Sequence, residues 1–338
     1  MKLKSFALLL LLPLLAQAES LTQKHKAQLI EALSEAISEQ YVLTENIDAI
    51  HQSISALSQS QIFHSESDAS QIAKMLSTEL DKFDHHFSVS WRANLEQGNA
   101  TAVKESWSSK MARKNSGFNH VEILEGNVGY VDFWGFADVS ETSRMTVSHA
   151  LGFLSHVDAL IIDLRQNGGG SAEMVQLISS YFFAKRTHLN SLYSRLSGRT
   201  IEYWTFDGVG PKFPEKLPIY ILISDYTFSA AEEFTYNFKQ LQKAIIVGET
   251  SKGGANPWHY VELGNGFRAA IPFAKAINPI TKTNWEGVGI TPDIAVPASE
   301  ALDRAYLMAL ETLKTGQHNY YQQVEIETRL NQLKMSAH

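Results

Sequence analysis

Ser229 stands where an apolar segment gives way to a helical pattern. Residues 219–223 predict a buried strand, a short turn follows, and a helix is predicted from Ala230. A serine at such a strand-to-helix turn can act as a nucleophile, with the N–H of Ala230 as one donor to an oxyanion. The same residues also fit an ordinary helix N-cap, with Glu232 completing a capping box. The two interpretations are compatible, because a helix start exposes the N–H groups that an oxyanion needs.

A second strand-to-helix turn carries three consecutive glycines, residues 168–170. An apolar strand is predicted before them at 159–164 and a helix after them at 171–183. Glycines let backbone N–H groups face a bound group, and the helix that follows adds its positive end. Such a turn can bind a phosphate or stabilise an oxyanion. No Lys-Ser/Thr pair follows the glycines, so the spacing of a P-loop is missing, and an oxyanion is the favoured interpretation.

A serine nucleophile needs a base, and His86 lies where a predicted helix gives way to an alternating strand. An imidazole at such a junction can be well oriented and still reach another part of the protein. Its neighbour His85 cannot point the same way in an extended segment, although the sequence favours His86 only weakly. The pair lacks the ligand spacing of a zinc helix, and the chain contains no cysteine. A metal site, a cysteine nucleophile and disulfide bonds are therefore not expected.

Glu286 is the candidate acid that would orient the base. It lies between Trp285 and two glycines in a predicted loop, residues 284–293. A carboxylate in a partly dry setting can orient an imidazole, whereas a solvated loop glutamate has no such role. Both interpretations stay open at this point.

Four segments together resemble the tail-specific (C-terminal processing) serine peptidase family. They are the glycine turn, residues 227–232, residues 247–257 and residues 285–289. The last two resemble the branch that contains the interphotoreceptor retinoid-binding protein and tricorn-type cores. The similarity extends over roughly residues 25–315.

The resemblance implies an α/β fold with a ClpP/crotonase-like core of β-β-α units, an N-terminal helical domain and C-terminal helices. It implies Ser229 as nucleophile and an oxyanion hole made by the N–H of Ala230 and of Gly169 or Gly170. Asp84-His85-His86 resembles the family's Asp-x-His pattern, which favours His86 as base. Glu286 matches the acid of tricorn-type members.

The chain departs from the family pattern in two ways. Serine–lysine processing enzymes carry an activating lysine after the Gly-Glu-Thr motif, whereas here Lys252 precedes the paired glycines. A Ser229–Lys252 dyad is therefore the alternative site. The interval 84–120 is too short for the PDZ domain with which such enzymes capture the C-terminus of a substrate, so no PDZ domain is expected.

Residues 1–18 are typical of a secretory signal peptide. Lys2 and Lys4 precede a leucine-rich run, and Ala16-Gln17-Ala18 fits a cleavage site. We therefore expect a protein exported to the periplasm or secreted, with membrane contact only through this segment. The net charge of −7 and the lack of basic clusters argue against nucleic-acid binding.

Residues 19–118 are expected to form the helical domain, with amphipathic helices over 21–83 and a polar linker or flexible loop over 92–118. Residues 119–338 are expected to form the peptidase core, with strands that alternate with helices as in parallel crossover units. The expected elements are a hairpin over 121–124 and 128–136, helices at 141–154, 171–183 and 230–241, strands at 159–164, 219–223, 244–247 and 267–271, two strands within 189–206, and closing helices at 299–314 and 322–334.

These residues predict an exported serine peptidase that hydrolyses peptides or unfolded proteins through an acyl-enzyme, without a cofactor. Its oligomeric state stays open. The alternative is a non-catalytic binder of a retinoid-like or lipid-like molecule, with aromatic residues along a cleft. The aromatic candidates for that cleft are Trp134, Phe136, Trp204, Phe206 and Trp258.

Overall fold

A six-stranded sheet forms the centre of the protein, whose computed structural model describes residues 21–92, 105–210 and 212–336. The strand order is β12-β8-β7-β4-β3-β2, and all neighbours are parallel except β2 and β3, which form the expected antiparallel hairpin. The strands are β2 (Phe118–Leu124), β3 (Val128–Phe133), β4 (Ala159–Asp163), β7 (Ile219–Ile223), β8 (Ile245–Gly248) and β12 (Ile294–Ala295).

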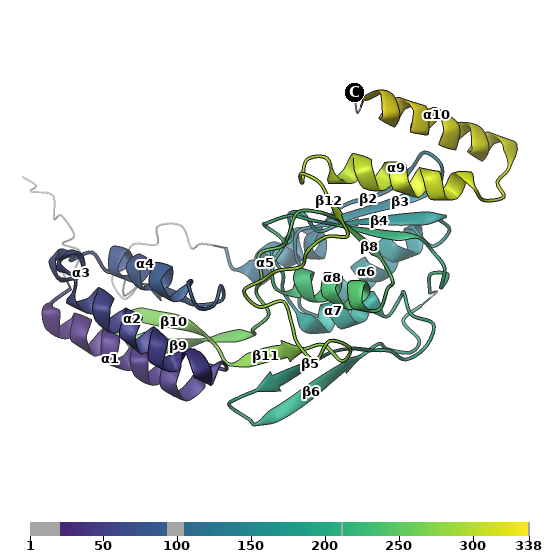
Figure 1. Ribbon diagram of the computed structural model, residues 1–338. Helices are drawn as coiled ribbons and strands as arrows, with labels where there is room; N and C mark the ends of the chain where they lie inside the picture. The colour runs from purple at the N-terminus through teal and green to yellow at the C-terminus, as the bar shows by residue number, and fades with distance from the viewer. Residues whose placement is uncertain (1–20, 93–104, 211, 337–338) are drawn as a thin grey trace, which may run out of the picture.

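Helices cover both faces of this sheet (Figure 1). One face packs against α6 (Glu141–Phe153), α7 (Ala172–Ser179) and α8 (Ala230–Gln240), and the other against α9 (Ala301–Lys314) and α10 (Tyr320–Ser336). Alternate residues of a strand serve the two faces: Leu160 faces the first layer and Ile161 the second. Because both faces are buried, these strands are continuous apolar runs rather than alternating ones.

A smaller sheet, in the order β11-β5-β6, projects from the helical layer of α7 and α8. The hairpin of β5 (His188–Ser194) and β6 (Arg199–Trp204) matches the two strands expected within 189–206. The strand β11 (Ala274–Ile277), which the sequence did not indicate, pairs with β5.

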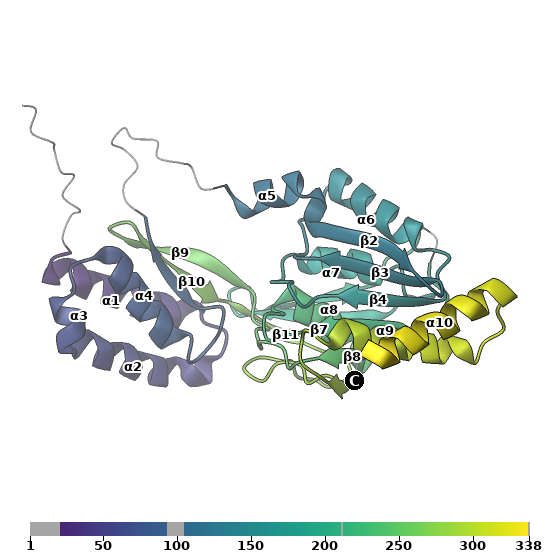
Figure 2. The same ribbon diagram turned by 90° about the horizontal axis from the view of Figure 1, so that it is seen from above.

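The N-terminal helices pack on a third sheet, in the order β1-β10-β9 (Figure 2). Two of its strands, β9 (Trp258–Gly264) and β10 (Phe267–Pro272), come from far along the chain, and β1 (Ser88–Trp91) pairs antiparallel with β10. The apolar core of this unit therefore joins early residues to Leu263 and Phe267. The helices are α1 (Gln23–Gln40), α2 (Ile47–Gln59), α3 (Gln61–Ser65) and α4 (Ala69–Leu80), and a 3-10 turn spans Thr44–Asn46.

The expectation of a linker or flexible loop over 92–118 is wrong for its described part. Residues Trp107–Arg113 form helix α5, and a 3-10 turn follows at Asn115–Gly117. Ser106 caps the helix by accepting a hydrogen bond from the N–H of Ser109, and Met111 is buried against the core. Residues 93–104 lie outside the described residues. The division of the chain into domains at residue 118 stays a prediction.

The predicted signal peptide, residues 1–18, also lies outside the described residues. Among the helices of the described chain, none has the length and apolar character that crossing a membrane requires. No PDZ domain occurs in the described parts of the chain. The described residues between β1 and β2 form helix α5 and a short 3-10 turn.

Candidate active site

Ser229 immediately precedes α8 and adopts a backbone conformation that few non-glycine residues show. Its φ of 57° and ψ of −118° lie outside the broad allowed regions, and such strain is often found at functional sites. The Ser229 N–H donates to Glu232 Oε2 (2.8 Å), and the N–H of Phe228 donates to the carbonyl of Asn167 (3.1 Å). These bonds hold the turn against the glycine turn at the carboxyl ends of β4 and β7.

His86 lies next to this serine. Its Nε2 is 3.1 Å from Ser229 Oγ, across 143 residues of sequence. The β1–β10 ladder begins two residues after His86, so it fixes the imidazole relative to the loop that precedes β9. The ring packs on Phe228 at 4.5 Å between centroids, and His86 is only 6% exposed. His85 points elsewhere, with Nδ1 3.1 Å from Asp81 Oδ1.

Two carboxyl groups lie on the far side of the imidazole. Asp84 Oδ1 is 3.7 Å from His86 Nδ1, and one ligand-type atom each of Asp84, His86 and Glu286 lies within 4.8 Å of the others. Asp84 accepts hydrogen bonds from the His86 N–H (2.9 Å) and Asn256 Nδ2 (2.8 Å), and Glu286 Oε2 accepts one from the Ala255 N–H (2.5 Å). His86 Nδ1 and Glu286 Oε1 are buried and make no hydrogen bond. Three ligand atoms this close could also hold a metal ion, which the sequence spacing did not indicate.

The surroundings of Glu286 disfavour its charged form. Burial and then the negative charge of Asp84 raise the pKa of Glu286 to about 8, the hydrogen bond from the Ala255 N–H offsets part of this rise, and the charge of Glu232 adds to it. The raised pKa therefore favours the protonated form of Glu286 near neutral pH. Asp84 was not among the residues predicted for the site, although the Asp-x-His spacing was the signal that could have identified it.

The glycine turn lies directly against the serine. Gly169 has φ of 98°, and a Cβ there would be 2.7 Å from Ser229 Cβ and 3.0 Å from Ala230 N, so only glycine fits. The Gly169 N–H donates to Asn167 Oδ1 (2.9 Å). Neither the Gly170 N–H nor the Ala230 N–H donates to another described residue. Both residues line the cavity with Ser229, so among the described residues their N–H groups are available to a bound oxyanion.

Glu232 joins the serine turn to the loop before β9. Besides the Ser229 N–H, its carboxylate accepts from Ser251 Oγ (2.6 Å), the Gly253 N–H (2.6 Å) and the Gly254 N–H (2.9 Å). Burial raises the pKa of Glu232, and these four hydrogen bonds oppose the rise. The capping-box pattern predicted only the bond to Ser229, because the other three partners are distant in sequence.

Lys252, the alternative base, is exposed. Its Nζ lies 4.8 Å from the centroid of the Phe228 ring, and no hydrogen bond or ion pair joins it to Ser229 among the described residues. The paired glycines that follow leave space for the histidine: a Cβ at Gly254 would lie 2.7 Å from His86 Cε1 and 2.1 Å from Phe228.

A cavity of about 770 Å³ opens over Ser229, His86 and the glycine turn. Of the aromatic residues suggested for a ligand cleft, only Trp258 lines it; Trp134, Phe136, Trp204 and Phe206 do not. The aromatic residues of its wall are Trp107, Tyr203, Phe228, Trp258, Tyr260 and Trp285.

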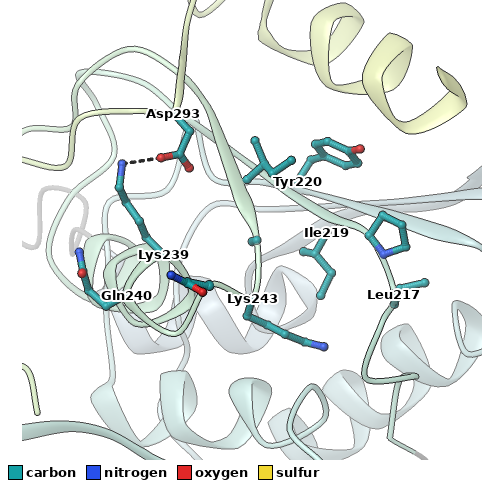
Figure 3. A pocket seen from close by; sticks show the side chains of 11 residues that line it. Leu217, Ile219, Tyr220, Lys239, Gln240, Lys243 and Asp293 are labelled. Atoms are coloured by element: carbon teal, nitrogen blue, oxygen red, sulfur yellow. Dashed lines mark ion pairs between the residues drawn. The ribbon is translucent and has the colours of Figure 1, made fainter. Parts of the chain in front are cut away.

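A second cavity, of about 500 Å³, lies at the opposite end of β7 and β8 (Figure 3). Lys239 and Asp293 form an ion pair of 2.8 Å at its edge. It contains none of the predicted site residues.

The sequence profile described as peptidase family S41 matches residues 127–296, which is 170 of 338 residues. The chain is 27% identical to a chloroplastic carboxyl-terminal-processing peptidase of Arabidopsis thaliana over 51% of its length. It is 24% identical to a carboxy-terminal-processing protease of Bartonella bacilliformis, also over 51%. These matches span only 32% and 39% of the two relatives.

A crystal structure of a Parabacteroides merdae protein superposes with a TM-score of 0.58 at 18% identity, over 85% of this chain and 96% of that one. This likeness confirms the expected mixed α/β fold with helical N- and C-terminal parts. The match to one of the named branches of the family stays a prediction. With half of its residues matched by the family profile, the chain belongs to peptidase family S41.

Proposed function

We propose that this protein is a serine peptidase that cleaves peptide bonds through an acyl-enzyme. The observation that carries the proposal is the 3.1 Å contact between Ser229 Oγ and His86 Nε2 at the start of α8, inside an open cavity. Membership of peptidase family S41 supports it.

In the proposed reaction His86 Nε2 accepts the proton of Ser229 Oγ as the oxygen attacks the substrate carbonyl carbon. The resulting oxyanion accepts hydrogen bonds from the N–H groups of Ala230 and Gly170, because the Gly169 N–H is already donated to Asn167. The imidazolium gives its proton to the leaving amine, and water then hydrolyses the acyl-enzyme by the same route.

Glu286 takes part as the orienting acid together with Asp84. The negative charge shared by this pair faces His86 Nδ1 and stabilises the imidazolium that forms during attack. A Ser229–Lys252 dyad is less well supported, since the Lys252 ammonium lies on the Phe228 ring.

The substrates proposed are peptides or unfolded protein segments, as the names of the relatives suggest. We also propose export, on the basis of the signal-like residues 1–18. N-terminal sequencing of the protein recovered from the periplasm or medium tests the export: a start near Glu19 supports it, and an intact Met1 contradicts it.

A fluorophosphonate probe tests the nucleophile. It is expected to label the wild-type protein and not Ser229→Ala, and an unstructured protein such as casein is expected to be cleaved only by the former. A folded wild-type sample that neither reacts with the probe nor cleaves casein would overturn the proposal. Lys252→Met is the matched control for the alternative dyad: retained labelling and cleavage are expected.

A further inference from the structure

The cavity over Ser229 is acidic. Its acidic lining residues are Asp138, Glu173 and Glu233, and none of its lining residues is a lysine or arginine. Lys252 and Arg268 lie on the Phe228 and Tyr260 rings of the wall but are not among the lining residues. A cavity lined by several carboxyl groups and by no cationic side chain is electrostatically suited to a cationic ligand.

Glu233 is the most deeply placed of these carboxyl groups. It lies in the first turn of α8, and its N–H donates to the carbonyl of Ser229 (2.9 Å). It is 5% exposed, lines the cavity and forms no ion pair with any described residue. The adjacent Asn190 amide favours the charged carboxylate but makes no hydrogen bond of normal geometry.

Glu173 lies on the first turn of α7, next to the glycine turn. Its Oε2 accepts a hydrogen bond from Ser171 Oγ (2.8 Å), and its Oε1 lies 3.4 Å from the Tyr203 hydroxyl. The pKa of Tyr203 is raised by burial and then by the charges of Glu173 and Glu233. Glu173, Glu233 and Tyr203 all line the cavity, and Glu173 contacts the Tyr203 hydroxyl directly.

We propose that Glu233 and Glu173 form a subsite that binds a lysine or arginine side chain of the substrate beside the scissile bond. This inference rests on the proposed peptidase function and names the substrate class. A cationic side chain would supply the partner that the buried Glu233 lacks, and the Tyr203 ring on the wall would contact its alkyl stem. Burial raises the pKa of the unliganded Glu233 to about 8, as expected for a carboxyl group without a fixed cation.

Binding to the Ser229→Ala protein tests the subsite without requiring hydrolysis. The probes are acetyl-Ala-Ala-Ala-Lys amide and its norleucine counterpart, which has the same stem without the ammonium group. Quenching of tryptophan fluorescence reports binding, because Trp258 and Trp285 line the cavity. We expect the lysine peptide to bind at least about tenfold more tightly, as a charge-assisted hydrogen bond in a dry site implies.

The ratio of the two affinities is expected to fall below about threefold in Ser229→Ala/Glu233→Gln, since this change removes the charge-assisted hydrogen bond. Glu327→Gln, which removes an exposed carboxylate on α10, is the matched control and should keep the ratio. Equal binding of both peptides, or a ratio that Glu233→Gln leaves unchanged, overturns the subsite. If Glu233→Gln does not fold, Glu173→Gln carries the same comparison. Failure of the peptidase proposal would appear separately, as loss of probe labelling in the wild type.

Discussion

The carboxyl pair beside His86 leads to a prediction that separates its two members. With its pKa raised to about 8, Glu286 is mainly protonated at pH 7. Glu286→Gln keeps the shape of the protonated side chain and removes little average charge. We therefore expect kcat/KM at pH 7 to fall by less than about threefold.

Asp84 is the carboxyl group that lies within ion-pair distance of the imidazole, with Oδ1 3.7 Å from His86 Nδ1. At an effective dielectric constant of about 20, an imidazolium Nδ1 and a carboxylate oxygen 3.7 Å apart attract each other by about 4.5 kcal/mol. Removing that attraction from the transition state corresponds to a loss of about three powers of ten in rate. In Asp84→Asn alone the loss should be smaller, about 10- to 100-fold, because Glu286 no longer faces a negative neighbour and ionises in its place.

The double variant Asp84→Asn/Glu286→Gln should show the full loss of about a thousandfold in kcat/KM. Steady-state cleavage of one fluorogenic peptide by all four proteins measures these effects, with thermal unfolding as a check on folding. Asp81→Asn is the matched control, because this carboxylate lies in the same segment but pairs with the outward-facing His85. A thousandfold loss in Glu286→Gln with a mild effect in Asp84→Asn would refute the assignment of the main attraction to the contact between Asp84 and His86.

Three further predictions concern the turn, the loop and the cavity. Gly169→Ala should abolish probe labelling, since its Cβ would lie 2.7 Å from Ser229 Cβ; labelling at the wild-type rate would contradict the close approach. Glu232→Gln replaces one carboxylate oxygen by an amide NH₂ group, which cannot accept the hydrogen bonds that the N–H donors now make. We expect the free energy of unfolding, measured by urea denaturation, to fall by about 3 kcal/mol or more. A loss below about 1 kcal/mol would show that these bonds contribute little. Buried Glu233 stays protonated in the folded protein up to a pKa of about 8, whereas the unfolded chain loses this proton near 4.5. Stability should therefore decrease as pH rises from 5 to 8, with a smaller decrease of Tm in Glu233→Gln, and equal slopes would argue against a buried proton at this site.

Most elements of the sheet and its helices could be predicted from residue patterns. The strands β4 and β7 are continuous apolar runs. The helix after β4 follows a glycine turn, and the helix after β7 has Ser229 as its N-cap residue, so local sequence patterns are enough to predict these elements. The strands β9, β11 and β12 were missed. Most of β9 alternates between exposed and half-buried residues, and β12 has two residues, so neither carries a clear apolar pattern. Helix α5 was missed because its segment is mainly polar.

The sequence by itself determined the residue types of the candidate site and the turns that carry them. The strand-turn-helix pattern around Ser229, the glycine turn and the Asp-x-His spacing all depend on local conformation, which neighbouring residues decide. Only the tertiary structure decided which residues contact one another in the site. The pairing of β1 with β10 brings His86 to Ser229, and Glu232 accepts hydrogen bonds from a loop distant in sequence. Glu233 lines the cavity. These contacts join residues of different elements, so they depend on how sheets and helices pack, which no local preference of the chain encodes.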